Sequence, residues 1–201
     1  MKQEQDLSFD TIRTTEDRYQ VNTYAKLPLA LERGEGMYVF GSDGRRYLDL
    51  YGGHAVALTP LDRESGRVVV RAVEEQLHRL MFYSNVVYSS VRAKAARDLV
   101  EAAPEPIDRV FFCNSGAEAN ETAMKIARRF TGKNEIVAMK GGFHGRTMGA
   151  LSATALGDYR SMFTPLVEGY RFVEFGSLEA VERALTKDTA AVLLEPIQSM
   201  A

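Results

Sequence analysis

The stretch RVFFCNSGAEANE at residues 109–121 joins an apolar run directly to a run of small and polar residues. Its first five residues, 109–113, predict a short buried strand. Between residues 119 and 130, apolar residues recur at helical spacing with charged residues between them, which predicts an amphipathic helix that Gly132 would end. The stretch therefore predicts a strand that leads through a tight turn into a helix.

The start of this predicted helix suits an anion. Ser115 can cap the helix, and Glu118, three residues later, completes a capping box. Gly116 and Ala117 leave the first backbone N–H groups uncovered at the positive end of the helix dipole, where a phosphate group binds well. Because many helices carry a capping box and bind nothing, the turn by itself also fits a purely structural cap.

A second cluster, GGFHGRT at residues 141–147, follows the apolar run IVAM at residues 136–139. Consecutive strands of a parallel sheet deliver the loops at their carboxyl ends to the same rim. We therefore expect this loop and the turn at residues 114–121 to face one crevice.

The chain changes character near residue 60. Before it, residues 37–40 and 45–50 predict two strands around the hairpin signal GSDG at residues 41–44, and the residues that precede them predict an irregular arm. After it, helical stripes alternate with predicted strands near Val110, Val137, Phe172 and Val192. This alternation predicts the α/β class with a doubly wound, mostly parallel sheet.

The turn and the loop together resemble the class III family of pyridoxal-phosphate-dependent aminotransferases, in which an S-G-A/T-E-A-N turn is followed by an F-H/W-G-R loop. The resemblance runs from about Tyr24 to the end of the chain and includes the segments at residues 24–28, 32–36, 43–49 and 193–198. Ornithine-type and acetylornithine-type enzymes are the most similar members, because their loop carries an arginine, here Arg146, that binds the substrate's α-carboxylate.

The resemblance implies fold-type I, an α/β fold with a mostly parallel sheet in its large domain. Residues 1–60 would form the N-terminal arm and hairpin of the small domain, and residues 61–201 would form part of the pyridoxal-phosphate-binding large domain. Both domains would be incomplete, because the resembled enzymes are about twice as long as this chain of 201 residues.

Two residues of the family's chemistry have no counterpart in the matched segments: the aspartate that pairs with the pyridine nitrogen and the Schiff-base lysine. We therefore assign no catalytic residue and expect the chain to be inactive alone. Unpaired strand edges and apolar surface would make it aggregate or require a partner. The family's active site is shared between two subunits, which implies a homodimer for the full-length protein.

The resemblance assigns five residues to the cofactor, pyridoxal 5'-phosphate. Gly116 and Ala117 would hold its phosphate through main-chain N–H groups, and Ser115 would add its hydroxyl group. Phe143 would stack on the pyridine face, with a core aromatic side chain as the alternative. His144 would pack against the cofactor's edge, although a structural histidine fits the sequence equally well.

Three residues are assigned to the substrate by the same resemblance. Arg146 would form a bidentate ion pair with a carboxylate, and a surface salt bridge is its alternative role. Tyr24 would support that carboxylate or lie at a subunit interface. Glu195 resembles the acid that pairs with a gating arginine, and a glutamate at a strand end is its alternative.

These assignments predict a transaminase that moves an amino group from an ornithine-like or acetylornithine-like ω-amine to a 2-oxo acid, so amino acids and 2-oxo acids are the expected partners. The enzymatic alternatives are a 4-aminobutyrate or lysine aminotransferase. An alternative of another class is a non-catalytic truncated remnant that keeps a phosphate-binding turn.

Composition is that of an ordinary cytoplasmic domain, with 45% hydrophobic and 26% charged residues, a net charge of −2 and a pI near 6.0. Basic residues form no patch, so no nucleic-acid partner is expected. No apolar run approaches the roughly 18 residues that span a bilayer, and no membrane partner is expected. The three histidines lack the spacing of metal ligands, so no metal site is expected.

Two segments depart from the family's pattern. Residues 58–66 read LTPLDRESG where the family commonly has a G-H-x-H-P stretch near the cofactor and the dimer partner. Ser199 and Met200 stand where glycine and glutamate usually follow the glutamine. We therefore expect the geometry at residues 58–66 to differ from the family's, and the last few residues to be altered or divergent.

Overall fold

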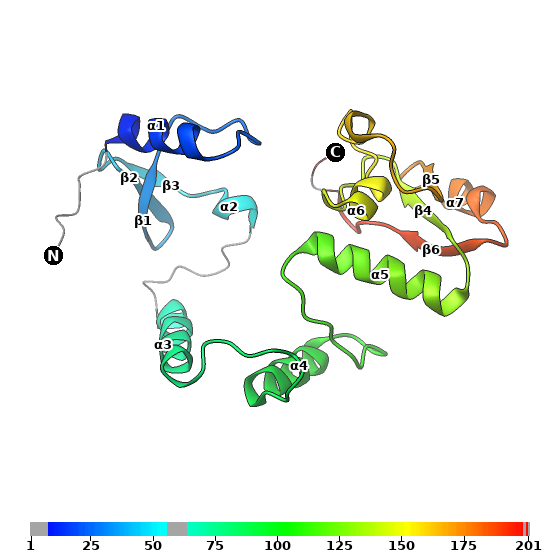
Figure 1. Cartoon of the computed structure of the whole chain (residues 1–201), viewed down its shortest axis with the longest axis horizontal. Helices are drawn as coiled ribbons and strands as arrows, with labels where there is room; N and C mark the ends of the chain where they lie inside the picture. Colours follow the sequence, from blue (N-terminus) through cyan, green and yellow to red (C-terminus); the bar gives the residue numbers. More distant parts are fainter. Residues whose placement is uncertain (1–7, 56–63, 199, 201) are drawn as a thin grey trace. The chain divides into compact units, whose positions relative to one another are not determined.

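The computed structural model describes residues 8–55, 64–198 and 200. The chain forms two compact units, one up to Tyr88 and the other from Ser89 onward (Figure 1). The domain boundary expected at residues 60 and 61, and most of the unusual stretch at residues 58–66, lie outside the described residues. No helix in the described part of the chain is both long and apolar enough to cross a bilayer.

The first unit contains an antiparallel sheet with the strand order β1-β2-β3 (Figure 1). Its elements in chain order are α1 (Phe9–Tyr19), β1 (Leu31–Glu35), β2 (Tyr38–Gly41), β3 (Arg46–Leu48), α2 (Gly52–Ala55) and α3 (Glu64–Arg79). The hairpin predicted around residues 41–44 is confirmed, because β2 and β3 pair in antiparallel register with Phe40 opposite Arg46. At its turn, Gly44 has a φ of +77° and the Asp43 carboxylate accepts the Arg45 N–H.

The prediction of an irregular arm before the hairpin is wrong, because this segment contains a helix and a strand. Helix α1 begins after Ser8, whose hydroxyl oxygen accepts the Thr11 N–H at 3.3 Å, and it buries no residue. Strand β1 is exposed along its whole length and pairs with β2 through its backbone. Neither element shows the apolar periodicity on which the sequence prediction relied, because neither buries an apolar face.

The second unit is built around a parallel sheet with the strand order β5-β4-β6 (Figure 1). Its elements are α4 (Ser90–Ala102), α5 (Gly116–Thr131), β4 (Glu135–Met139), α6 (Met148–Ala153), the 3-10 helix η1 (Ser161–Phe163), β5 (Tyr170–Val173), α7 (Leu178–Ala184) and β6 (Thr189–Leu193). The strands predicted near Val137, Phe172 and Val192 are therefore confirmed, as is the α/β class.

Strand β4 lies at the centre of the core, and its residues alternate between the two faces of the sheet. On one face, Ile136 packs against Met124 of α5 and Ala153 of α6. On the other face, Val137 and Met139 pack with Val173 of β5, and α7 covers them. Residues 136–138 are fully buried, so the sheet is covered by helices on both faces.

The prediction of a strand at residues 109–113 is wrong. Residues 110–113 form no strand, and the described residues provide no partner strand for them. Phe111 and Phe112 are 64% and 44% exposed. A strand requires a hydrogen-bonded neighbour, and an apolar run alone does not supply one.

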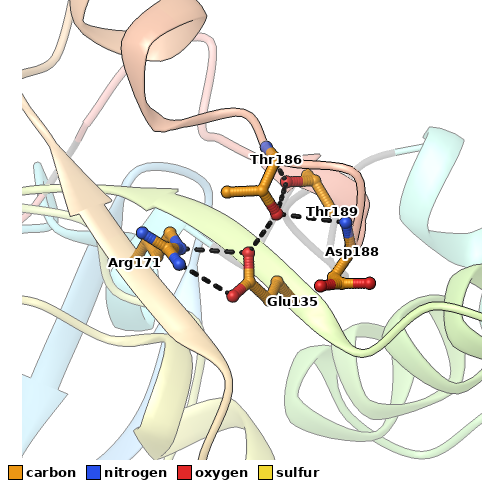
Figure 2. A network of polar contacts seen from close by, with 5 residues as sticks. All are labelled: Glu135, Arg171, Thr186, Asp188 and Thr189. Carbon is orange, nitrogen blue, oxygen red and sulfur yellow. Dashed lines mark hydrogen bonds and ion pairs between the residues drawn. The ribbon is translucent and has the colours of Figure 1, made fainter.

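Polar side chains join the three parallel strands at their amino ends (Figure 2). Glu135, the first residue of β4, receives two hydrogen bonds from the Arg171 guanidinium of β5, at 3.0 and 2.8 Å. The same carboxylate accepts the Thr186 hydroxyl at 2.6 Å, and the Thr189 hydroxyl at the start of β6 accepts the Thr186 N–H. The network fixes the amino end of the sheet, opposite the end from which the loop at residues 141–147 departs.

Candidate active site at the carboxyl end of the parallel sheet

Helix α5 begins at the turn that the sequence analysis singled out. Ser115 is its N-cap, and the Ser115 hydroxyl oxygen accepts the Glu118 N–H at 3.2 Å. The Glu118 carboxylate accepts the N–H of Asn114 at 2.6 Å, whereas a standard capping box would bond the N–H of Ser115 itself. The predicted cap is therefore present in a form displaced by one residue. The predicted end is confirmed, because Gly132 adopts the left-handed conformation with a φ of +70°.

The first turn of α5 offers hydrogen-bond donors. The N–H groups of Gly116 and Ala117 have no acceptor among the described residues, and Gly116 is exposed. A Cβ built on Gly116 would meet no atom within 4 Å, so there is room in front of these donors. Free donors at the positive end of a helix 16 residues long are the arrangement that binds phosphate groups.

The loop that follows β4 is fixed through its backbone. The Phe143 N–H donates to Glu195 Oε1 at 2.7 Å, and the His144 N–H donates to Thr154 Oγ1 at 3.0 Å. The carbonyl group of His144 accepts a hydrogen bond from Asn120 Nδ2 at 2.7 Å. Three separate elements, the end of β6, the end of α6 and helix α5, therefore hold two successive residues.

The loop lies directly against the start of α5. Gly145 has a φ of +130°, and a Cβ built there would lie 2.7 Å from Ala117 Cβ and 3.1 Å from Ala150 Cβ. Both the backbone conformation and the close approach require glycine. The turn and the loop are thus in contact, as the parallel topology predicted.

Glu121 of α5 caps the helix that follows the loop. Its carboxylate accepts the Thr147 hydroxyl at 2.6 Å and the N–H groups of Gly149 and Ala150 at 2.9 and 3.1 Å. Burial alone would raise the pKa of Glu121, but these hydrogen bonds and the charge of Lys125 bring it below its usual range. Thr147 forms no side-chain cap of its own, so Glu121 supplies the acceptors that α6 needs.

His144 is almost fully buried, with 4% of its surface exposed. Its Nε2 is buried and has no hydrogen-bond partner, and a Cβ built on Gly142 would lie 3.0 Å from it. Burial lowers the pKa of the His144 imidazole, and the charge of Glu195 opposes this shift only in part. Burial therefore favours the neutral imidazole of His144.

The predicted site residues fall into two groups. Ser115, Gly116 and Ala117 lie on the first turn of α5 and its cap, and Phe143, His144 and Arg146 lie on the adjacent loop. Glu195 joins them through its bond to the Phe143 N–H. Tyr24 lies in the other unit, where it is 56% exposed and lines a groove beside α1. Contacts within the second unit therefore connect all of the predicted residues except Tyr24.

Among the described residues, no three or more histidine, cysteine, aspartate and glutamate side chains are grouped so as to hold a metal ion. Lys140, which leads into the loop, is exposed and forms a salt bridge with Glu174. Cys113 is also exposed, and its thiol contacts the Ser115 carbonyl oxygen at 3.4 Å.

The sequence model of the family described as aminotransferase class-III matches residues 19–201. The chain belongs to the class-III aminotransferases. Curated relatives in this family include the acetylornithine aminotransferases of Methanopyrus kandleri, 48% identical over 185 residues, and Archaeoglobus fulgidus, 43% identical over 186 residues. Each match covers 92% of this chain but 47% and 48% of the respective relative, so the chain spans about half the length of the curated relatives it matches.

Solved aminotransferases share the fold. The ornithine aminotransferase of Toxoplasma gondii, solved with partial occupancy of PLP at its active site, is 26% identical with a TM-score of 0.86; the match covers 96% of this chain and 46% of that one. The acetylornithine aminotransferase of Elizabethkingia anophelis is 25% identical with a TM-score of 0.74, over 95% and 45% of the two chains. The expectation of fold-type I is confirmed.

The sequence did not predict the contacts that Asn120, Glu121 and Thr154 make in this candidate site. Asn120 and Glu121 lie within the quoted helix sequence, but their partners are 24 to 29 residues away. No local sequence pattern predicts such contacts. An asparagine followed by a glutamate on an amphipathic helix is typical of a solvated face.

Proposed function

We propose that this chain supplies the cofactor-binding part of a pyridoxal-phosphate-dependent transaminase. Its substrates would be an acetylornithine-like or ornithine-like ω-amine and a 2-oxo acid. The observation that carries the proposal is that the first turn of α5, with its free N–H groups, lies against the loop of Phe143 where Gly145 meets Ala117. The names of the relatives favour acetylornithine as the amino donor.

The residues on the first turn of α5 fit the phosphate of the cofactor. Gly116 and Ala117 would donate their N–H groups to it, and the Ser115 hydroxyl, which already accepts from Glu118, still has its own proton to donate. The open space in front of Gly116 supports this fit. When bound, pyridoxal phosphate supplies an electron sink that stabilises negative charge at the substrate's α-carbon.

The loop residues would position the ring and the substrate. Phe143, whose backbone is held by Glu195, would provide an apolar face for the ring without a competing proton donor. Arg146 is exposed on the same loop and would bind a substrate carboxylate. A substrate role for Glu195 stays a prediction, as does a carboxylate contact for Tyr24. A neutral His144 would add bulk at the site without adding positive charge.

Other parts of the prediction are also proposed on the basis of family membership. The full-length protein would be a cytoplasmic homodimer, and this chain would be inactive alone, because no lysine lies in a sequence like the family's Schiff-base site. A 4-aminobutyrate or lysine aminotransferase remains the enzymatic alternative. A non-catalytic remnant with a phosphate-binding turn remains the alternative of another class.

Titration of the 201-residue chain with pyridoxal phosphate, followed by absorbance and equilibrium dialysis, tests the proposal. We expect saturable binding that Gly116→Glu weakens by about tenfold or more, because a carboxylate would occupy the anion's place. Ala123→Glu is the matched control: it puts the same charge at an exposed position two turns along the same helix. Absence of binding to the wild-type chain, or equal binding by the Gly116→Glu variant, would contradict the proposal.

A further inference from the structure

The loop that carries Phe143 is tied to the helix that carries the free N–H groups by one long-range side-chain bond at the loop's centre. Asn120 Nδ2 donates to the carbonyl oxygen of His144 at 2.7 Å across 24 residues of sequence. Asn120 lies one helical turn after Gly116. Its side chain therefore connects the proposed phosphate contact with the proposed ring contact over a short distance.

The other two bonds to this part of the loop come from elsewhere in the unit. Glu195, just after β6, accepts the Phe143 N–H, and Thr154, at the end of α6, accepts the His144 N–H. These bonds fix the loop against the sheet and α6. The Asn120 bond is different, because it comes from α5 itself and ties the centre of the loop to that helix, as Glu121 ties the loop's last residue, Thr147.

The carbonyl group of His144 has a second reason to need Asn120. His144 is 4% exposed, and a buried carbonyl oxygen that loses its donor is left without the water that would otherwise solvate it. The described residues provide the Asn120 amide as its donor. Loss of this amide would drive the peptide to rotate or shift, and the Phe143 peptide is the one that precedes it.

We infer that Asn120 is a positioning residue for the cofactor: it sets the distance between the α5 phosphate contact and the Phe143 loop before any ligand arrives. A ligand held at both points gains affinity when the two contacts are preorganised at the correct spacing. A ligand that uses the phosphate contact alone gains nothing from Asn120. This inference rests on the proposed function and specifies how that site is built.

Asn120 is a better test position than its neighbour Glu121. Glu121 accepts three hydrogen bonds and caps α6, so its removal would destabilise that helix as well as the loop. Asn120→Ala removes a neutral amide and leaves the charge of the helix unchanged. Asn134→Ala is the matched control, because Asn134 is an exposed asparagine of the same unit.

The experiment compares two probes on the 201-residue chain: pyridoxal phosphate and inorganic phosphate. We expect Asn120→Ala to weaken pyridoxal phosphate binding by about tenfold and inorganic phosphate binding by less than about twofold. Amide hydrogen exchange of residues 142–147 in the free chain should accelerate in Asn120→Ala, while Asn134→Ala should match the wild-type chain in all three measurements.

Asn120→Asp serves as a second variant, because it keeps the size of the side chain and loses the donor; its charge control is Asn134→Asp. Unchanged pyridoxal phosphate binding by both Asn120 variants would overturn the inference. Equal losses for the two probes would also overturn it, because they would indicate a merely structural role. If the wild-type chain binds inorganic phosphate but not pyridoxal phosphate, the proposed function itself fails and this inference falls with it.

Discussion

The two ends of the parallel sheet in the second unit differ in how far their polar groups are hydrogen-bonded. At the amino end, the Glu135 carboxylate accepts hydrogen bonds from Arg171 and Thr186 (Figure 2). In the adjacent turn, the Thr186 hydroxyl oxygen accepts the Asp188 N–H. At the carboxyl end, the N–H groups of Gly116 and Ala117 and the Nε2 of His144 find no partner among the described residues.

The difference shows how the same three strands serve two purposes. A network in which each polar group is bonded contributes to stability and leaves nothing for a ligand to bind. Groups that stay unpaired cost stability unless a ligand or water satisfies them. The carboxyl end is therefore the end where substitutions should change binding, and the amino end is the end where they should change stability alone.

The largest expected effect is at the contact between the loop and α5. Gly145→Ala combines a φ of +130° with a Cβ placed 2.7 Å from Ala117 Cβ, and we expect it to lower the free energy of unfolding by about 3–5 kcal/mol. Gly157→Ala is the control, because its φ of +48° is also positive but a Cβ there meets nothing within 4 Å. We expect Gly157→Ala to lower the free energy of unfolding by about 1–2 kcal/mol, measured by urea denaturation. Equal losses would show that the close approach contributes nothing.

The next effect concerns the cap that α5 provides for α6. Glu121→Ala leaves the buried N–H groups of Gly149 and Ala150 without their acceptor, and we expect a loss of about 2–3 kcal/mol. Because the folded pKa of Glu121 lies below its ordinary value of 4.5, its contribution is complete above that pH and disappears as the pH falls through the folded pKa. Urea denaturation at pH 7 measures the first effect, and a series of pH values below 4.5 measures the second. Glu182→Ala, on the exposed side of α7, should leave stability nearly unchanged.

A smaller effect is expected from the buried imidazole. The folded pKa of His144 lies below its ordinary value of 6.5, so the unfolded chain binds the extra proton first and stability falls as the pH drops below 6.5. The slope cannot exceed about 1.4 kcal/mol per pH unit for one proton. His144→Gln removes this group, so thermal denaturation between pH 7 and pH 5 should show a flatter pH dependence for the variant. Parallel profiles would refute the assignment of a neutral, buried His144.

The smallest effect is expected at the amino end. In the wild-type chain, the hydrogen bonds from Arg171 lower the pKa of Glu135, and Glu135→Gln weakens this pair. We therefore expect a small decrease in the urea midpoint at pH 7. The decrease should vanish in acid, where the wild-type carboxylate is protonated. Pyridoxal phosphate binding should be the same in the variant and in the wild-type chain. A change in the affinity for pyridoxal phosphate would contradict the conclusion that substitutions at the amino end change stability alone.

The parts of the fold that the sequence predicted are those with local or periodic signals. The Asp43-Gly44 turn predicted the hairpin, and Ser115 and Gly132 predicted where α5 begins and ends, because caps and turns are formed by neighbouring residues. Strand β1 was missed because its pairing runs through the backbone of an exposed segment. The strand predicted at residues 109–113 was wrong because pairing depends on a neighbour, which an apolar run does not specify.

The candidate site was predictable in its motifs and not in its internal contacts. The turn and the loop were both found, and parallel topology predicted that they would meet. The roles of Asn120, Glu121 and Thr154 depend on contacts across 10 to 29 residues. Such contacts follow from the packing of α5 against the loop and α6, which no spacing rule describes.

The displaced cap of α5 changes how many backbone donors are free at the start of the helix. Because the Glu118 carboxylate bonds the Asn114 N–H, the N–H of Ser115 is left without an acceptor among the described residues, in addition to those of Gly116 and Ala117. A standard capping box would occupy that donor. Three successive backbone N–H groups at the start of α5 are therefore left for water or a ligand to satisfy.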